Sequence, residues 1–129
     1  SNTWYWGIGC GLVDGKPFGY NIGYGFGDTS NASENMLFYD GKCHKLDLVD
    51  FGMPEENVMD EWTMTSSDNR FNMKFKPFFN DHTNISAGII CEKAEKLFGM
   101  LNGTAVLDDG TVLNIENIPV FHEKVHHKW

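Results

Sequence analysis

The sharpest chemical signature in the sequence lies near its end, in the run His122-Glu123-Lys124-Val125-His126. This run satisfies the pattern H-E-x-x-H, in which two histidines on one helix face bind zinc and the glutamate acts as a base. A catalytic zinc needs a third protein ligand, which such families supply downstream, and little sequence follows His126. We therefore expect no metal, and we keep His122 and His126 as candidate ligands of a zinc-dependent hydrolase only as an alternative.

A second set of residues could perform acid–base chemistry. Asp28, Glu34 and His44 supply carboxylates and an imidazole around two loops, and they would form a catalytic group if those loops converge. The competing interpretation is structural, because acidic residues often cap turns and a histidine can lie on an exposed strand face. We retain these three residues as candidate catalytic residues.

Three residues are candidates for holding a ligand. Tyr20 and Tyr24 belong to an aromatic strand, and Asn35 introduces the apolar run 36–39. Small-molecule sites are mostly apolar and contain a few polar groups that orient the ligand. We therefore expect Tyr20, Tyr24 and Asn35 to contribute to a binding site at the mouth of a barrel.

Composition narrows the class of protein. The 129 residues carry a formal charge of -8, include 14 glycines and are 14% aromatic, which favours strands and tight turns and argues against nucleic acid as a partner. No apolar run is long enough for a membrane span, and no phosphate loop or dinucleotide fingerprint indicates a cofactor. Three cysteines without paired spacing indicate free thiols, and hence a cytoplasmic protein.

The elements that must position these residues are mostly strands. Asp-Gly pairs predict hairpins at residues 14–15, 40–41 and 109–110. We expect at most eight strands, near residues 4–13, 18–27, 35–39, 42–51, 62–65, 71–75, 96–107 and 111–115. Pro77 should end its strand or place it at an edge, residues 80–86 should form a turn-rich connection, and residues 54–58 could form a helical turn.

The end of the chain has a different periodicity. Ile118, Phe121, Val125 and Trp129 recur at three- and four-residue spacing, behind Asn117 as a candidate N-cap. The pattern predicts a short C-terminal amphipathic helix that closes one side of the sheet. The fold class expected from the sequence is therefore an all-β, mostly antiparallel domain, a calycin- or lipocalin-like barrel or a strongly coiled sheet, with that helix.

The first hairpin leaves two registers open. Bulky residues alternate with glycines on both of its strands, so the pairing decides what each face presents. A two-residue Asp14-Gly15 turn would place Trp6 opposite Gly23, and Gly9 opposite Tyr20, so that rings cover glycines. A bulge would instead create one aromatic face and one glycine-lined face open to a ligand or another domain. The tight turn is favoured because Asp-Gly suits it.

Several short motifs follow one another along nearly the whole chain, namely Gly19-Tyr20-Asn21-Ile22-Gly23, Glu34-Asn35, Tyr39-Asp40-Gly41-Lys42, His44-Lys45-Leu46, Phe98-Gly99, Gly103-Thr104, Asp109-Gly110-Thr111, His122-Glu123 and Lys128-Trp129. Their order resembles the C-terminal half of the bacterial domain-of-unknown-function family 2804. It implies a longer parent chain whose N-terminal half is missing here, and a fold similar to two-domain calycin-like proteins that include carotenoid hydratases. It implies no established catalytic residues.

These observations support three functions. The favoured one is a single domain, residues 1–129, that binds an apolar small molecule or docks on its partner half. The second is a hydratase or isomerase with acid–base residues at the junction of two halves. The third is a purely structural half whose exposed hairpin face pairs with the missing domain.

Overall fold

The computed structural model describes residues 2–24, 35–87 and 90–128, and these residues form nine strands and no helix. The strands are β1 (Asn2–Val13), β2 (Lys16–Tyr24), β3 (Met36–Tyr39), β4 (Lys42–Lys45), β5 (Val49–Asp50), β6 (Trp62–Ser66), β7 (Phe71–Ala87), β8 (Ile90–Val106) and β9 (Val112–Lys128). The expected all-β class is confirmed, but the described residues form one strand more than the eight expected at most. Nothing in the described part of the chain could cross a membrane as a helix.

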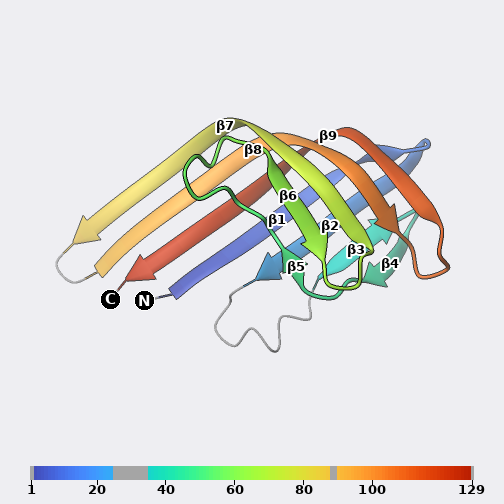
Figure 1. Ribbon diagram of the computed structural model, residues 1–129, viewed down its shortest axis with the longest axis horizontal. Coiled ribbons are helices and arrows are strands. Elements are labelled where there is room, and N and C mark those ends of the chain that lie inside the picture. Colours follow the sequence, from blue (N-terminus) through green and yellow to red (C-terminus); the bar gives the residue numbers. More distant parts are fainter. Residues whose placement is uncertain (1, 25–34, 88–89, 129) are drawn as a thin grey trace.

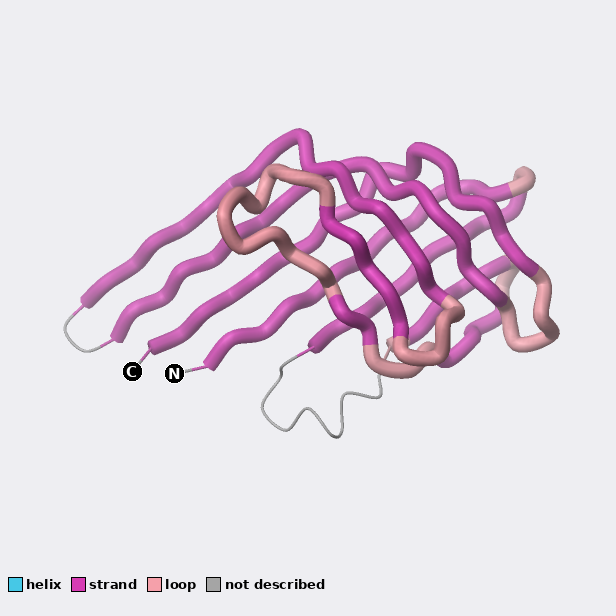
Figure 2. Tube along the Cα trace, in the orientation of Figure 1, coloured by secondary structure: helices cyan, strands magenta, loops and turns pink. Residues whose placement is uncertain are grey.

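All nine strands belong to one antiparallel sheet with the order β4-β3-β2-β1-β9-β8-β7-β6-β5. The sheet curls strongly into a half-barrel, and Figures 1 and 2 show β5 and β6 lying across the concave side from β1 and β2. β5 contacts β2 in this way without pairing with it. The first and last strands pair with each other at the centre of the sheet, so the N- and C-termini lie side by side (Figure 1).

The first hairpin has the tight-turn register. Asp14 and Gly15 have φ angles of 52° and 75°, as both central positions of a type I′ turn require. Trp6 lies opposite Gly23, and Gly9 opposite Tyr20, as the two-residue turn predicts. The bulged alternative, with one wholly glycine-lined face, is excluded.

The predicted C-terminal helix is wrong. Residues 112–128 form β9, which pairs with β8 on one side and β1 on the other. The apolar spacing was misleading because Ile118 faces the concave side, whereas Phe121 lies on the opposite face of the same strand. Asn117 is not a helix cap, since it has a φ of 50° at the register shift between β8 and β9.

The expectations for the middle of the chain were partly wrong. β7 continues through Pro77 to Ala87, so residues 80–86 are strand and not a connection. Pro77 is nevertheless at a local edge, because β6 pairs only with residues 72–75 of β7 and a register shift follows Pro77. Residues 54–58 form no helix, and the backbone N–H of Asp60 instead donates to the carbonyl of Asn57 and closes a turn over residues 57–60.

The core occupies the concave side of the sheet. Its largest fully buried side chains are Trp62, Tyr20, Phe18, Phe71 and Phe75. The convex side carries a row of rings across four strands, in which neighbouring centroids from Trp6 to Phe121 to Phe98 to Phe79 are 5.8, 5.0 and 6.0 Å apart. The two sides of the sheet therefore differ, with a packed interior and a partly exposed aromatic exterior.

The turn between β6 and β7 fastens the connection between β4 and β5. Burial alone would raise the pKa of Asp68, but bonds from the Ser66 hydroxyl and from the backbone N–H groups of Asp47 and Arg70 lower it below its usual value. The ionised carboxylate thus fixes the segment that leads into β5. That segment carries one wall of the site described next.

Candidate functional site

His44, expected to be catalytic, lies at a joint between two turns. It is buried, and its Nδ1 accepts a hydrogen bond of 3.1 Å from the backbone N–H of Asp108. Arg70 donates to the Asp108 carboxylate at 2.5 Å and to backbone carbonyls, and the Arg70 hydrogen bond lowers the pKa of Asp108. His44 therefore holds the loop between β8 and β9 against β4, and no pocket-lining residue contacts it among the described contacts.

Asn35, expected to orient a ligand, has its polar atoms bonded to the backbone. Its Oδ1 accepts the N–H of Gly23 at 2.8 Å, and its Nδ2 donates to the carbonyl of Asp47 at 3.1 Å. Asn35 is 1% exposed, so it connects β2 to the β4–β5 segment from within the protein. These bonds give it a structural role.

Three further candidates lie wholly or partly outside the described residues. Asp28 and Glu34 lie outside the described residues. The backbone of Tyr24 ends β2 opposite Tyr5, but its side chain also lies outside the described set. Their expected roles in catalysis and ligand binding stay predictions.

Tyr20 is brought to a partner that the sequence did not indicate. Its hydroxyl lies 2.7 Å from Nε2 of His122, a contact between residues 102 positions apart in the chain. Both residues point to the concave side and are almost completely buried, at 1% and 0% exposure. Their hydrogen bond is a polar pair inside an otherwise aromatic core.

The surroundings keep His122 uncharged. Phe75, Trp62 and Phe51 place their ring centroids 4.1, 5.6 and 5.9 Å from the imidazole. Burial among these rings lowers the pKa of His122 from 6.5 to about 3, and burial also raises the pKa of Tyr20. At neutral pH the pair is a phenol bonded to a neutral imidazole.

One atom of this pair has no hydrogen-bond partner. The Nδ1 of His122 is buried and unbonded. If Tyr20 donates to Nε2, only the Nδ1–H of His122 lacks a partner, whereas the opposite tautomer would also leave the phenol proton unpaired. Because each buried unpaired polar group costs about 1–3 kcal/mol, the first tautomer is favoured. His122 then presents an unpaired N–H donor to the interior.

Gly7 makes room for the imidazole. It lies opposite His122 on β1, and a Cβ at this position would be only 2.5 Å from Cδ2 of His122. The ring thus lies over the bare backbone of β1 with its Cδ2 edge down and reaches Tyr20 on β2. Nδ1 is not among the three ring atoms nearest this position, which are Cδ2, Nε2 and Cγ. The glycines of β1 were a usable signal that bulky side chains on a neighbouring strand lie above them.

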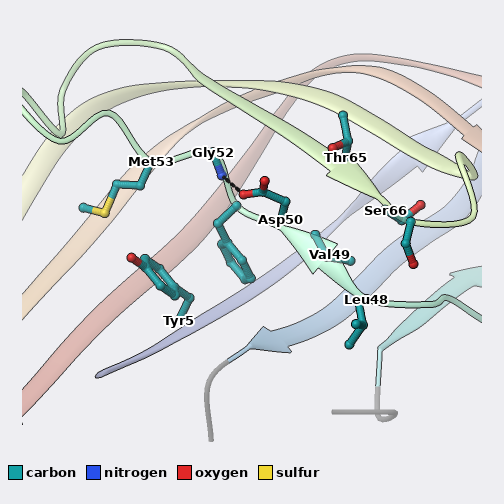
Figure 3. A pocket seen from close by; sticks show the side chains of 10 residues that line it. Tyr5, Leu48, Val49, Asp50, Gly52, Met53, Thr65 and Ser66 are labelled. Carbon is teal, nitrogen blue, oxygen red and sulfur yellow. Dashed lines mark hydrogen bonds between the residues drawn. The ribbon is translucent and has the colours of Figure 1, made fainter. Parts of the chain in front are cut away.

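A pocket of about 430 Å³ opens beside the edge strand β5. Figure 3 shows Tyr5 and Met53 at one end and Leu48 and Ser66 at the other. The lining combines apolar and polar side chains, and comprises Tyr5, Leu48, Val49, Asp50, Phe51, Gly52, Met53, Thr65, Ser66 and Ser67. Such a lining suits a molecule with an apolar body and a polar group. None of these residues was a sequence candidate.

Phe51 separates this pocket from the buried pair. It lines the pocket and stacks on Tyr5 with centroids 5.5 Å apart, and it also packs edge-on against His122. The Phe51 ring therefore contacts both the accessible pocket and the buried imidazole of His122. The pocket and the polar pair form one candidate binding site.

The geometry assumed for the zinc motif is absent. His122 and His126 lie on a strand, where residues four apart are separated by roughly 13 Å, not on adjacent turns of a helix. The Nε2 of His122 is already bonded to Tyr20, and the side chain of His126 lies outside the described set. The described residues contain no group of three His, Cys, Asp or Glu side chains able to hold a metal.

The hydrogen bond between Tyr20 and His122 leads to a specific stability prediction. Tyr20→Phe should destabilise the protein by about 1–3 kcal/mol, because both ring nitrogens of His122 then lie buried without partners. The double variant Tyr20→Phe/His122→Leu should recover most of that loss, since it removes the buried polar atoms together. Urea unfolding of the wild type, both single variants and the double variant gives the coupling energy. Additive losses would show that the two side chains do not interact.

Fold and site together define an all-β protein, a strongly curled antiparallel half-barrel with a buried Tyr–His pair on its concave side. Within that class the chain belongs to the family described as a domain of unknown function, DUF2804, which matches residues 1–129. No curated protein and no solved structure matches the chain.

Proposed function

We propose that this protein binds a small, mainly apolar molecule in the pocket beside β5. The observation that carries the proposal is the pocket itself, about 430 Å³ in size and lined on one side by Tyr5, Phe51 and Met53. This volume falls within the range of small-molecule sites, and its Ser, Thr and Asp side chains can orient a polar group of the ligand.

The curl of the sheet supports this function. β5 is an edge strand of two residues, so the sheet stops where the pocket begins. Closed barrels of about eight strands can hold one small ligand, and the pocket here lies at the open edge of a similarly curled sheet. The proposal includes four expectations that follow from the sequence. The domain is calycin-like, it belongs to a longer bacterial chain of two domains, it docks on the other half of that chain, and the protein is cytoplasmic.

The acid–base alternative has less support from the described geometry. Of its three candidate residues only His44 is described, and its Nδ1 is occupied by the backbone of Asp108. The zinc alternative loses the helix on which its ligand spacing depends. Binding is therefore the function we put forward.

A pair of matched variants tests the pocket. Thr65 lines it, whereas Thr63, two residues earlier on the same face of β6, does not. Thr65→Trp should fill the pocket and weaken binding of a dansyl-labelled undecanoic acid at least tenfold, while Thr63→Trp should leave binding within about twofold. Both residues are exposed, and tryptophan is well accepted in strands, so both variants should fold.

The measurement is a fluorescence titration, with circular dichroism as the check on folding. Equal binding by the two variants would place the probe elsewhere, for instance on the convex row of rings. No binding by the wild-type protein would refute the proposed function.

A further inference from the structure

The unpaired donor of His122 requires an explanation beyond packing. Buried polar groups almost always have partners, and this one belongs to a side chain with no exposed surface. The described rings around it offer no acceptor oxygen. The N–H of Trp62 is itself a donor and is already bonded to the carbonyl of Val58 at 2.8 Å. What the site lacks is an acceptor.

A route to this donor leads through Phe51. This residue directly follows the short strand β5 and begins the segment 51–61, which has no regular structure. Its ring lines the pocket and also packs edge-on against His122. A change of its rotamer would therefore open the pocket toward the imidazole.

The chemistry of the site selects the kind of acceptor. His122 is neutral, and the rings that contact it among the described residues belong to Tyr20, Phe51, Phe75 and Trp62. An anionic group placed there would lose its hydration without gaining an opposite charge, which is very costly. A neutral carbonyl oxygen accepts one N–H bond and tolerates apolar surroundings.

We propose that the Nδ1–H of His122 binds the carbonyl oxygen of a neutral, apolar ligand, such as a ketone, aldehyde or ester, that enters from the β5 pocket past Phe51. Tyr20 acts as a positioning residue, because its bond to Nε2 fixes the tautomer in which Nδ1 carries the proton. The inference rests on the proposed binding function and adds the class of ligand.

A pair of probes of nearly equal shape isolates this hydrogen bond. 2-Heptanone carries a carbonyl oxygen where 2-methyl-1-heptene carries a methylidene group. We expect wild-type protein to bind the ketone about tenfold more tightly, as one hydrogen bond in a buried site implies. The preference should disappear in Tyr20→Phe/His122→Leu, and Thr65→Trp should weaken binding of both probes.

A second measurement needs no variant. In protein labelled with ¹⁵N in its histidine rings, the Nδ1–H proton of His122 should shift downfield with the ketone and not with the alkene. Equal binding of the two probes, or no shift specific to the ketone, overturns the carbonyl assignment and leaves the pocket intact. Absence of binding of the dansyl-labelled acid to the wild-type protein would instead refute the proposed function itself. The two failures are therefore distinguishable.

Discussion

Between pH 6.5 and pH 4, the protein should lose about 1 kcal/mol of stability for each unit that the pH falls, and His122→Leu should remove most of this loss. The pKa of His122 is lowered from 6.5 to about 3 by burial, so the folded protein keeps this imidazole neutral across that interval. The unfolded chain binds a proton there. Unfolding therefore takes up one proton, and the free energy of unfolding decreases as the pH falls.

The sign and the pH window follow from these two pKa values. Above pH 6.5 both states are neutral at His122, and the residue adds no pH dependence. Below about pH 3 both are protonated, and the slope from this residue ends. Carboxylates with lowered pKa, such as those of Asp68 and Asp108, add their own acid sensitivity, but in the unfolded chain they titrate mainly below pH 5.

Urea unfolding at half-unit pH intervals measures the effect. Wild type and His122→Leu should differ in slope between pH 6.5 and pH 4.5, where the other histidines are common to both proteins. Parallel profiles would mean that His122 takes up its proton at the same pH in the folded and the unfolded protein. That result would contradict its burial among Phe51, Phe75 and Trp62. A neutral imidazole is also what the carbonyl-binding proposal requires.

Gly52→Ala should cost about 3 kcal/mol or more, whereas Gly15→Ala should cost only about 1 kcal/mol. Both glycines have positive φ angles, 59° and 75°. A Cβ at Gly52 would lie 1.9 Å from the carbonyl oxygen of Thr63, but at Gly15 it would meet nothing within 4 Å. Both variants place alanine in the left-handed region. The difference between their free energies of unfolding therefore measures the collision with the carbonyl oxygen of Thr63.

Thermal and urea unfolding of the two alanine variants checks this. Gly52 lies where the segment after β5 passes over β6, and its N–H is held by the Asp50 carboxylate at 2.9 Å. Relaxing the collision would move Phe51 and the pocket wall, so Gly52→Ala should also weaken binding of the dansyl-labelled acid. Equal losses of stability in the two variants would show that this crossing is not tightly packed.

The part of the fold that local chemistry controls could be predicted. The Asp14-Gly15 turn determined the register of the first hairpin, because only one hairpin type accepts positive φ at both positions. The C-terminal strand could not be predicted, since Ile118, Phe121 and Val125 fit a helical stripe equally well. Whether these residues form a helix or a strand depends on their pairing with β1 and β8. A short stretch of sequence does not show that pairing.

The same distinction explains the site. Tyr20 was a ligand-binding candidate because it lies on an aromatic strand, but its partner His122 was considered only as a metal ligand. Their contact depends on the central position of β9, which no local pattern indicates. Phe51 was missed for a similar reason, because its importance comes from its contacts with the pocket and with His122, which its sequence neighbours do not indicate.

The pairing of the first and last strands also affects how the chain folds. β1 and β9 are neighbours in the middle of the sheet, so hydrogen bonds such as those around Trp6 and Glu123 join residues from opposite ends of the sequence. In the described sheet this is the one pairing of distant strands, since the other seven join consecutive strands. Closing the long loop between β1 and β9 costs conformational entropy before the pairing gains contacts, so we expect this pairing to form late. During synthesis, the two halves of the sheet can form hairpins early, but they cannot join until β9 has left the ribosome.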